Sequence, residues 1–422
     1  MRRMVSGGAW FFLISAVIII VLSLILRANE ITDYIIEMVE SRVGRQEQTE
    51  DEEENQEITA AATREIYYIS PEEYGFNTGS STVENDDSFY HAGDLELPIN
   101  GATGYAAVDL NLMSGNDVIG RISAGTAFRI LREESDWWLI SAGNAGEKQE
   151  GWVEHALCMI NLPDVVPSII YDNTNVYNSA FMSSEESIPG ITGERLYSYS
   201  DRFDGRVFNE RLQKDEFIMP VLYSTAKRVS IAQRNALENG DTLIMYEAFR
   251  PYSAQTAIVN GLTAFANANP HIRAGINTAT WNMSWFIATG ISNHQIGYAI
   301  DVSLARVIIM AELETNGYKY RRVIQAEYYA MPTHIHELSV LSISQTRPIN
   351  PDLLDSWRGA ELSEGMKNNP HAQALRQYCT DAGFTPLASE WWHFNDLHTR
   401  FAMPRSGNGN FEIKEIFSIP PA

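Results

Sequence analysis

A histidine and an aspartate stand seven positions apart in the stretch SNHQIGYAID, residues 292–301. A strand over residues 298–302 would point Asp301 to one face of a sheet, and Gly297 lets the chain turn sharply just before it. Such a turn could bring His294 over the face that carries Asp301. Imidazole and carboxylate groups are suitable zinc ligands, and catalytic zinc usually takes three protein ligands plus water. A buried histidine beside a turn aspartate is the competing interpretation of this stretch alone.

A glutamate and a histidine stand three positions apart in SEWWHF, residues 389–394. Such a pair can supply one metal ligand, His393, and one general base, Glu390. A regular strand would point the two side chains in opposite directions, so we expect a bend or bulge between them. The two intervening tryptophans would wall the site and raise the pKa of the carboxyl group towards the working pH. Aromatic packing, in a core or facing lipid, is the alternative.

An arginine lies at a strand-to-helix transition in YEAFRPYSAQ, residues 246–255. Arg250 follows a buried-looking strand and precedes a helix that opens with Pro251. An arginine there would point off the end of the strand, a common place for a substrate-binding group. Its guanidinium could hold a carboxylate or stabilise an oxyanion. A structural salt bridge is the competing interpretation.

Strands and helices of mixed order must position these groups. DTLIMYEAF, residues 241–249, is typical of a buried strand, and GYAIDVSL, residues 297–304, alternates like a second strand. Helical spacing of apolar residues follows Pro251, which suits a first turn. It recurs in HAQALRQYCTDAGF, where Gly383 is a suitable C-terminal cap. These elements interleave without a regular βαβ rhythm, so we predict an α+β fold for residues 164–422.

Taken in order, strand-FRP-helix, SxHxxGxAxD and EWWH resemble the zinc D,D-peptidases. This family includes the D-alanyl-D-alanine dipeptidases of vancomycin-resistance clusters and the related D,D-carboxypeptidases. The resemblance covers roughly residues 165–405 and implies an α+β catalytic domain with one Zn²⁺ per chain. By position it implies three groups of site residues: zinc ligands His294, Asp301 and His393; the general base and acid Glu390; and the oxyanion-stabilising Arg250 with the substrate-binding Ser292.

Two weaker motifs suggest the dipeptidase-like branch of this family, YDNTNVYN near residue 171 and MPTHIHELS at residues 331–339. The second contains His334 and His336. Their spacing is not HExxH, and the family pattern does not use them for zinc. We therefore expect them in a loop near the substrate cleft and not as metal ligands.

The region upstream of the catalytic domain consists of short β-rich runs separated by turns, as in a small barrel or sandwich. It resembles a bacterial SH3-like domain, although Met113 stands where that family more often has arginine. We assign residues 99–163 to this barrel, and LPDVVPS, residues 162–168, to a linker. The resemblance implies a cell-wall or peptide-binding module; a passive spacer barrel is the alternative. The matching features are LNLMSG, Gly120, Gly125, Trp137–Trp138 and Gly151–Trp152–Val153.

An apolar run from Ala9 to Leu26 follows two arginines at the N-terminus. Its length is near the minimum for a spanning helix, and the following RANEITDY is a poor cleavage site for a signal peptide. We therefore predict a transmembrane helix over residues 9–27, with residues 1–8 in the cytoplasm and the rest of this single-pass membrane protein outside the cell. Residues 28–98 include QEQTEDEEENQE and are expected to form an acidic, largely disordered stalk.

Composition limits the possible partners. The chain has 422 residues, enough for two or three domains. Its formal net charge of -23 repels phosphate backbones, so nucleic acid is a poor candidate partner. The two cysteines, Cys158 and Cys379, are far apart and form no CxxC, which excludes a zinc-finger framework and a thioredoxin-like motif.

Three functions fit these patterns. The first is a membrane-anchored D,D-carboxypeptidase that trims peptidoglycan stem peptides, which lie outside the cell like the predicted catalytic domain. The second is a D-alanyl-D-alanine dipeptidase, although the best-known dipeptidases are cytoplasmic. The third is a non-catalytic cell-wall-binding protein, against which the intact set of ligands, base and arginine argues.

Overall fold

The computed structural model describes twelve segments of the chain, and they belong to one compact unit, Arg64–Ala422. The predicted cytoplasmic tail, the predicted transmembrane helix and most of the predicted stalk lie outside these segments. Among the described residues, no helix has the length and apolar character needed to cross a membrane. The described segments are 66–69, 94–143, 148–172, 181–182, 187–188, 209–214, 218–270, 273–274, 277, 280–403, 409–413 and 415–422.

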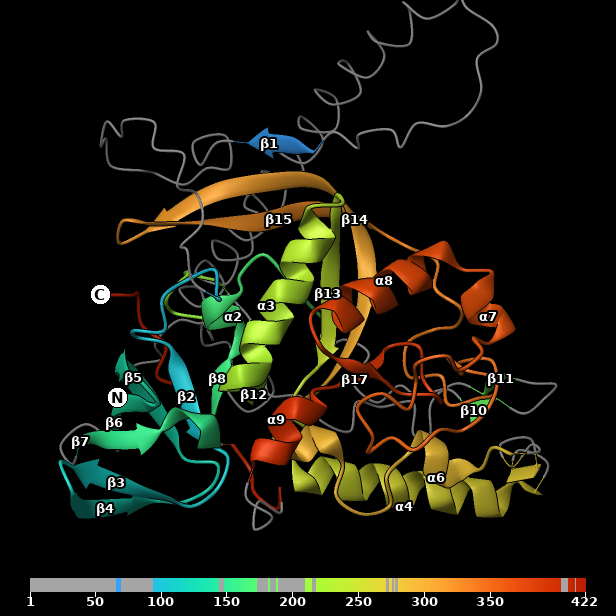
Figure 1. The fold of residues 1–422 in the computed structure, drawn as a ribbon, viewed down its shortest axis with the longest axis horizontal. Helices are drawn as coiled ribbons and strands as arrows, with labels where there is room; N and C mark the ends of the chain where they lie inside the picture. Colours follow the sequence, from blue (N-terminus) through green and yellow to red (C-terminus); the bar gives the residue numbers. More distant parts are fainter. Residues whose placement is uncertain are drawn as a thin grey trace, which may run out of the picture. The chain divides into compact units, whose positions relative to one another are not determined.

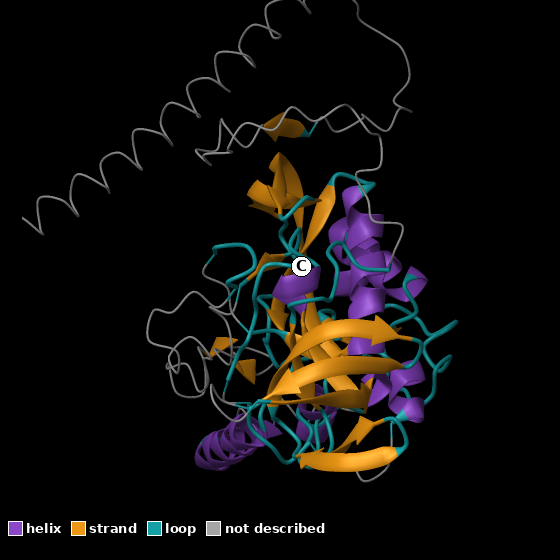
Figure 2. Cartoon of the chain, turned by 90° about the vertical axis from the view of Figure 1, so that its left-hand side faces the viewer, coloured by secondary structure: helices purple, strands orange, loops and turns teal. Residues whose placement is uncertain are grey.

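The first sheet contains eight strands, paired antiparallel in the order β12-β8-β2-β5-β6-β7-β3-β4 (Figure 1). Its short strands agree with the predicted β-rich region, and their inward side chains, such as Trp138 and Phe128, are buried. The described strands form an open sheet and no closed barrel, and the SH3-like assignment stays a prediction. Figure 2 views the molecule from the side of this sheet. The bounds are β2 Thr103–Ala106, β3 Leu110–Ser114, β4 Asp117–Ile122, β5 Ala127–Glu134, β6 Trp137–Ala142, β7 Gln149–Glu154, β8 Cys158–Asn161 and β12 Pro220–Leu222.

The two predicted domains share this sheet and one hydrophobic core. β12 comes from the region assigned to the catalytic domain, yet it pairs with β8. The rings of Trp138 and Tyr223 meet edge to face at 4.7 Å, and both cysteines are free and buried in the shared core. The segment expected as a linker begins with the buried helix α2 (Leu162–Val165). Its buried Asp164 accepts hydrogen bonds from the Thr103 backbone and the Ser418 hydroxyl.

The second sheet carries the central strands of the predicted catalytic domain, in the order β16-β17-β14-β13-β9, with β1 and β15 also paired to β14. β13 runs antiparallel to β14, which runs antiparallel to β17. β10 (Phe181–Met182) and β11 (Ser187–Ile188) form a separate pair. The bounds of the seven strands are β1 Tyr67–Ile69, β9 Ile170–Tyr171, β13 Asp241–Glu247, β14 Ala299–Thr315, β15 Tyr318–Tyr328, β16 Thr385–Pro386 and β17 His393–Asn395.

Helices α3 and α8 lie together against this second sheet (Figure 1). The fully buried β13 and the start of α4 directly after Pro251 confirm two predicted elements. α8 is also confirmed, and Gly383 follows its end with φ of +92°. The architecture mixes helices with largely antiparallel sheets, and its assignment to the D,D-peptidase fold stays a prediction. The helices are α3 Tyr223–Leu237, α4 Tyr252–Ala268, α6 Met283–Phe286, α7 Glu364–Lys367, α8 Pro370–Asp381 and α9 Leu397–Ala402, with the 3-10 turns η1 His155–Leu157 and η3 Asn293–Ile296.

Candidate metal centre

A short turn before β14 carries the first histidine of the site. η3 is closed by a capping box in which the Ser292 hydroxyl accepts from the His294 backbone and the Gln295 side chain accepts from the Ser292 backbone. Gly297 ends the turn with φ of +83°. A Cβ atom there would come within 2.7 Å of the Met159 sulfur, so both conformation and space require glycine. The sharp turn predicted at Gly297 is confirmed.

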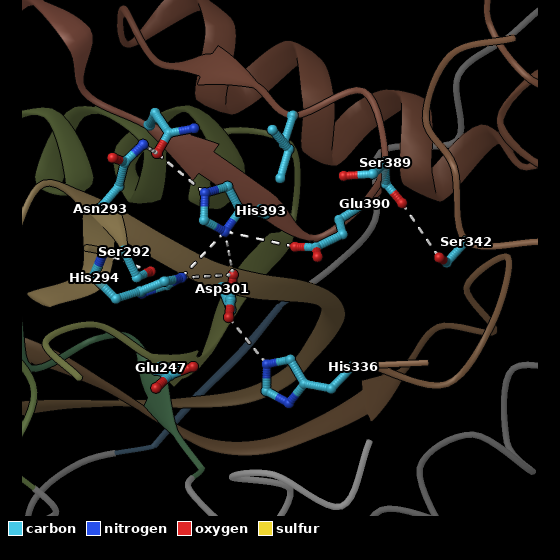
Figure 3. Close-up of polar contacts among 12 residues, drawn as sticks. Glu247, Ser292, Asn293, His294, Asp301, His336, Ser342, Ser389, Glu390 and His393 are labelled. Carbon is cyan, nitrogen blue, oxygen red and sulfur yellow. Dashed lines mark hydrogen bonds and ion pairs between the residues drawn. The ribbon is translucent and has the colours of Figure 1, made fainter. Parts of the chain in front are cut away.

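The second histidine and the aspartate face each other across two paired strands. In the antiparallel register of β14 and β17, Asp301 lies directly opposite His393. The His393 Nδ1 atom is 3.0 Å from Asp301 Oδ1 and 3.1 Å from His294 Nε2 (Figure 3). The His294 Nε2 atom is 3.4 Å from the same aspartate oxygen. One nitrogen of each ring and one carboxylate oxygen therefore converge on a single point, and all three residues are buried.

The outer hydrogen bonds of the two rings decide which nitrogens face this point. His294 Nδ1 lies 2.7 Å from the carbonyl oxygen of Ala248, which can only accept, so Nδ1 carries the proton. His393 Nε2 lies 3.0 Å from Asn395 Oδ1, and that amide is oriented by a bond from Asn293 Nδ2. When neutral, both rings thus present unprotonated nitrogens to the centre. Such outer partners fix the tautomer of metal-binding histidines.

The three convergent atoms fit a metal ion in type and in spacing. Three lone pairs so close together repel one another unless a proton or a cation lies between them. Zinc ligands at 2.0–2.2 Å in tetrahedral geometry lie about 3.3 Å apart, close to the separations of these atoms. The buried His294, Asp301 and His393 could therefore hold a metal ion. Two imidazoles and a carboxylate are donors that zinc accepts.

The ionisable groups of the centre shift one another's pKa values. Burial raises the pKa of Asp301, but the charge and hydrogen bond of His294 and the bonds of His336 and His393 outweigh it and hold the pKa well below its usual range. Burial lowers the pKa of His393, but the hydrogen bond and charge of Asp301 and the charge of Glu390 leave it raised. The aspartate is thus ionised.

Glu390 lies next to the candidate metal ligands, with its Oε2 atom 3.7 Å from His393 Nδ1. It precedes β17, and the chain bends at Trp391 and Trp392, which confirms the bend expected between Glu390 and His393. Burial raises the Glu390 pKa to about 7; the charge of His393 opposes this shift and that of Asp301 adds to it. A carboxylate with such a pKa can exchange a proton near neutral pH.

Arg250 takes part in a salt bridge and also faces the site. Its Nε and one terminal nitrogen donate to the two oxygens of Glu247 at 2.9 and 2.6 Å, and its other terminal nitrogen donates to Gln255 Oε1 at 2.7 Å. The nitrogen bonded to Glu247 is also 3.8 Å from Asp301 Oδ2. The salt-bridge interpretation is therefore correct for this arginine, and its charge also lies beside the candidate metal ligands.

A cavity of about 290 Å³ brings all six predicted site residues together: Arg250, Ser292, His294, Asp301, Glu390 and His393. Trp392 lines it, whereas Trp391 packs perpendicular to Trp392 at 5.2 Å. The loop that contains His334 and His336 is predicted to lie near the substrate cleft, and His336 does line the cavity. Other lining residues carried no motif signal, and they include Trp285, Asn293, Asp352, Asn395 and Arg400.

Comparison with known proteins adds no relative: no protein-family model matches the chain, and a search of curated proteins finds no match. The resemblance to the zinc D,D-peptidases rests on the motifs of this sequence.

Proposed function

We propose that this protein is a zinc-dependent D,D-carboxypeptidase that hydrolyses D-Ala-D-Ala-type bonds in peptidoglycan stem peptides. The observation that carries the proposal is the convergence of His294 Nε2, His393 Nδ1 and Asp301 Oδ1 beside Glu390 in one cavity. The ordered motifs that resemble the zinc D,D-peptidases supply the substrate class and the expectation of one zinc ion per chain.

A zinc ion held by the three ligands would lower the pKa of a bound water to about 7 and polarise the scissile carbonyl. Glu390 would accept a proton from the attacking water and deliver it to the nitrogen of the leaving D-alanine. The hydroxyl group adds to the carbonyl carbon and the C–N bond breaks, so atoms and charge balance. Glu390 is buried beside the candidate ligands, 3.7 Å from His393 Nδ1, so it is placed to make both transfers.

Arg250 and Ser292 have supporting roles in this proposal. Arg250 would contribute positive charge near the developing oxyanion, while its bonds to Glu247 and Gln255 hold the guanidinium in place. Ser292 lines the cavity and its hydroxyl caps the turn that carries His294. It would help to hold the substrate beside the ligands.

The predicted location favours the carboxypeptidase over the dipeptidase. A membrane helix at residues 9–27 and an external catalytic region would place the site among wall peptides, and residues 99–163 could add a cell-wall contact. The dipeptidase is the second candidate, because MPTHIHELS and YDNTNVYN resemble that branch and His336 of the first motif lines the cavity. A non-catalytic cell-wall-binding protein is the third.

Product analysis tests the proposal. The full chain, purified in detergent and with its metal content determined, is incubated with D-Ala-D-Ala and with a stem pentapeptide ending in D-Ala-D-Ala. We expect D-alanine release from the pentapeptide, abolished by a chelator and restored by zinc. Release from the dipeptide alone would establish the dipeptidase instead. No release from either substrate would contradict both enzymatic assignments.

A matched variant tests the catalytic base. Glu390→Gln keeps the shape of the side chain and removes the base, so it should bind zinc like the wild type but lose turnover about 100- to 10,000-fold. Wild-type turnover in this variant would contradict the role of Glu390.

A further inference from the structure

The Asp301 carboxylate faces two sets of partners. Its Oδ1 atom points to His294 and His393, while His336 Nε2 approaches its Oδ2 atom at 3.0 Å from the opposite side (Figure 3). Both Asp301 and His336 are buried. One oxygen therefore belongs to the metal centre, and the other is held by a residue from a distant loop.

The direction of the bond between His336 and Asp301 follows from chemistry. A carboxylate that binds a cation is ionised and can only accept hydrogen bonds. His336 Nε2 must therefore carry the proton and donate it to Asp301 Oδ2. This is the arrangement by which outer residues orient the carboxylates that bind metals.

The backbone around His336 forms a tight turn that directs the ring towards Asp301. His336 has φ of +59°, in the left-handed region that few non-glycine residues adopt, although histidine tolerates it better than most. The Glu337 backbone N–H closes the turn on the His334 carbonyl. The His336 ring stands perpendicular to Trp392, with centroids 5.9 Å apart. Such uncommon backbone conformations concentrate at functional sites.

A second metal ion offers another explanation of the same atoms, because Glu247, Asp301 and His336 could also hold a cation. However, both Glu247 oxygens accept from Arg250. The same guanidinium lies 3.8 Å from Asp301 Oδ2. A second cation would have to displace this positive charge. The contacts therefore favour a hydrogen-bonding role for His336 over a ligand role.

We infer that His336 is a positioning residue of the metal centre, whose bond to Asp301 Oδ2 holds Oδ1 towards the metal. The inference rests on the proposed function only in that His294, Asp301 and His393 bind a metal ion. Without the bond, the carboxylate could rotate away or accept other partners. Asp301 Oδ1 would then no longer be held at metal-binding distance from the two histidine nitrogens.

A matched pair of variants tests the hydrogen bond that His336 donates to Asp301. His336→Gln places an amide donor near the position of Nε2, whereas His336→Met has nearly the same length and no donor. His336→Asn is a second loss variant, because its amide is too short to reach Asp301 but tolerates positive φ. His334→Met is the control, since His334 lies two residues away and is exposed.

The readouts are zinc affinity, by competition with a chromophoric chelator, the number of ions bound, and thermal unfolding of the metal-free protein. We expect His336→Met and His336→Asn to bind zinc about 10- to 100-fold more weakly. His336→Gln and His334→Met should stay within about threefold of the wild type. The metal-free variants should unfold near the wild-type temperature, a result that separates positioning from a general structural role.

Two results would overturn the inference: wild-type affinity in both loss variants, or equal losses in His336→Gln and His336→Met. Two ions in the wild type and one in His336→Gln would also overturn it, by making His336 a ligand. The proposed function is judged separately. Zinc binding that depends on His336 without any peptide hydrolysis would leave the inference intact and refute the peptidase. Hydrolysis with zinc binding that does not depend on His336 would support the peptidase and refute the inference.

Discussion

Glu390 should destabilise the metal-free protein at neutral and alkaline pH. The folded protein keeps this buried carboxyl group protonated up to about pH 7, whereas its ordinary pKa is 4.5. Between these values the folded state binds more protons than the unfolded state, so the free energy of unfolding falls as pH rises. A rise in pKa from 4.5 to about 7 corresponds to about 3 kcal/mol. That penalty is absent at pH 4.5 and complete above about pH 7.

Glu390→Gln removes the penalty because the amide stays neutral at every pH. In the presence of a chelator, the variant should therefore be more stable than the wild type at pH 8, by up to about 3 kcal/mol. The difference should shrink towards zero near pH 4.5. Denaturant unfolding of both proteins at pH 4.5, 6 and 8 measures it. Glu150→Gln is the control, since Glu150 is exposed on β7, and it should show no such trend.

A difference between Glu390→Gln and the wild type that stays constant from pH 4.5 to 8 would refute this reasoning, because burial would then not have raised the Glu390 pKa. A variant less stable than the wild type at pH 8 would refute it too. The expected result, greater stability with lost turnover, is the pattern of a residue kept for its chemistry at a cost in stability.

Three further predictions follow from the packing around the site. Gly297→Ala should destabilise the protein by about 2 kcal/mol or more, because alanine at φ of +83° is strained and its Cβ would meet the Met159 sulfur; denaturant unfolding with an unchanged midpoint would contradict this. Asn395→Leu removes the acceptor of His393 Nε2 and should weaken zinc binding about 10- to 100-fold in chelator competition, whereas wild-type affinity would show that the ring needs no such support. A chain starting at residue 165 loses β8, the partner of β12, and the contact of Trp138 with Tyr223. We expect a cooperative thermal transition by circular dichroism from a chain starting at residue 64 and none from this shorter chain, and equal transitions would mean that the regions fold independently.

Sequence alone identified the candidate groups for chemistry and the local structure around them. The positive φ of Gly297 and the bend at Trp391 and Trp392 follow from short stretches of chain. Residue type and nearest neighbours govern such features, so they can be read from a few positions. The buried β13 and the helix after Pro251 were predictable for the same reason, since apolar spacing reports local periodicity.

Sequence reasoning was weakest where distant segments meet. β12 pairs with β8 in the first sheet, and the expected linker is buried. No pattern in the sequence indicates either feature. The sequence leaves a salt bridge and a site role as alternatives for Arg250, and the structure shows that a salt-bridged arginine can also line the cavity. Local patterns could not choose, because the choice depends on what packs around the guanidinium.

The sequence by itself thus determined which side chains can bind a metal and move a proton. Only the tertiary structure decided how they are oriented. The register that sets Asp301 opposite His393, the outer bonds from Ala248 and Asn395, and the approach of His336 to Asp301 Oδ2 all join residues that the sequence patterns do not link. Ligand identity is a property of single residues, whereas ligand orientation depends on hydrogen bonds whose partners become neighbours only after folding.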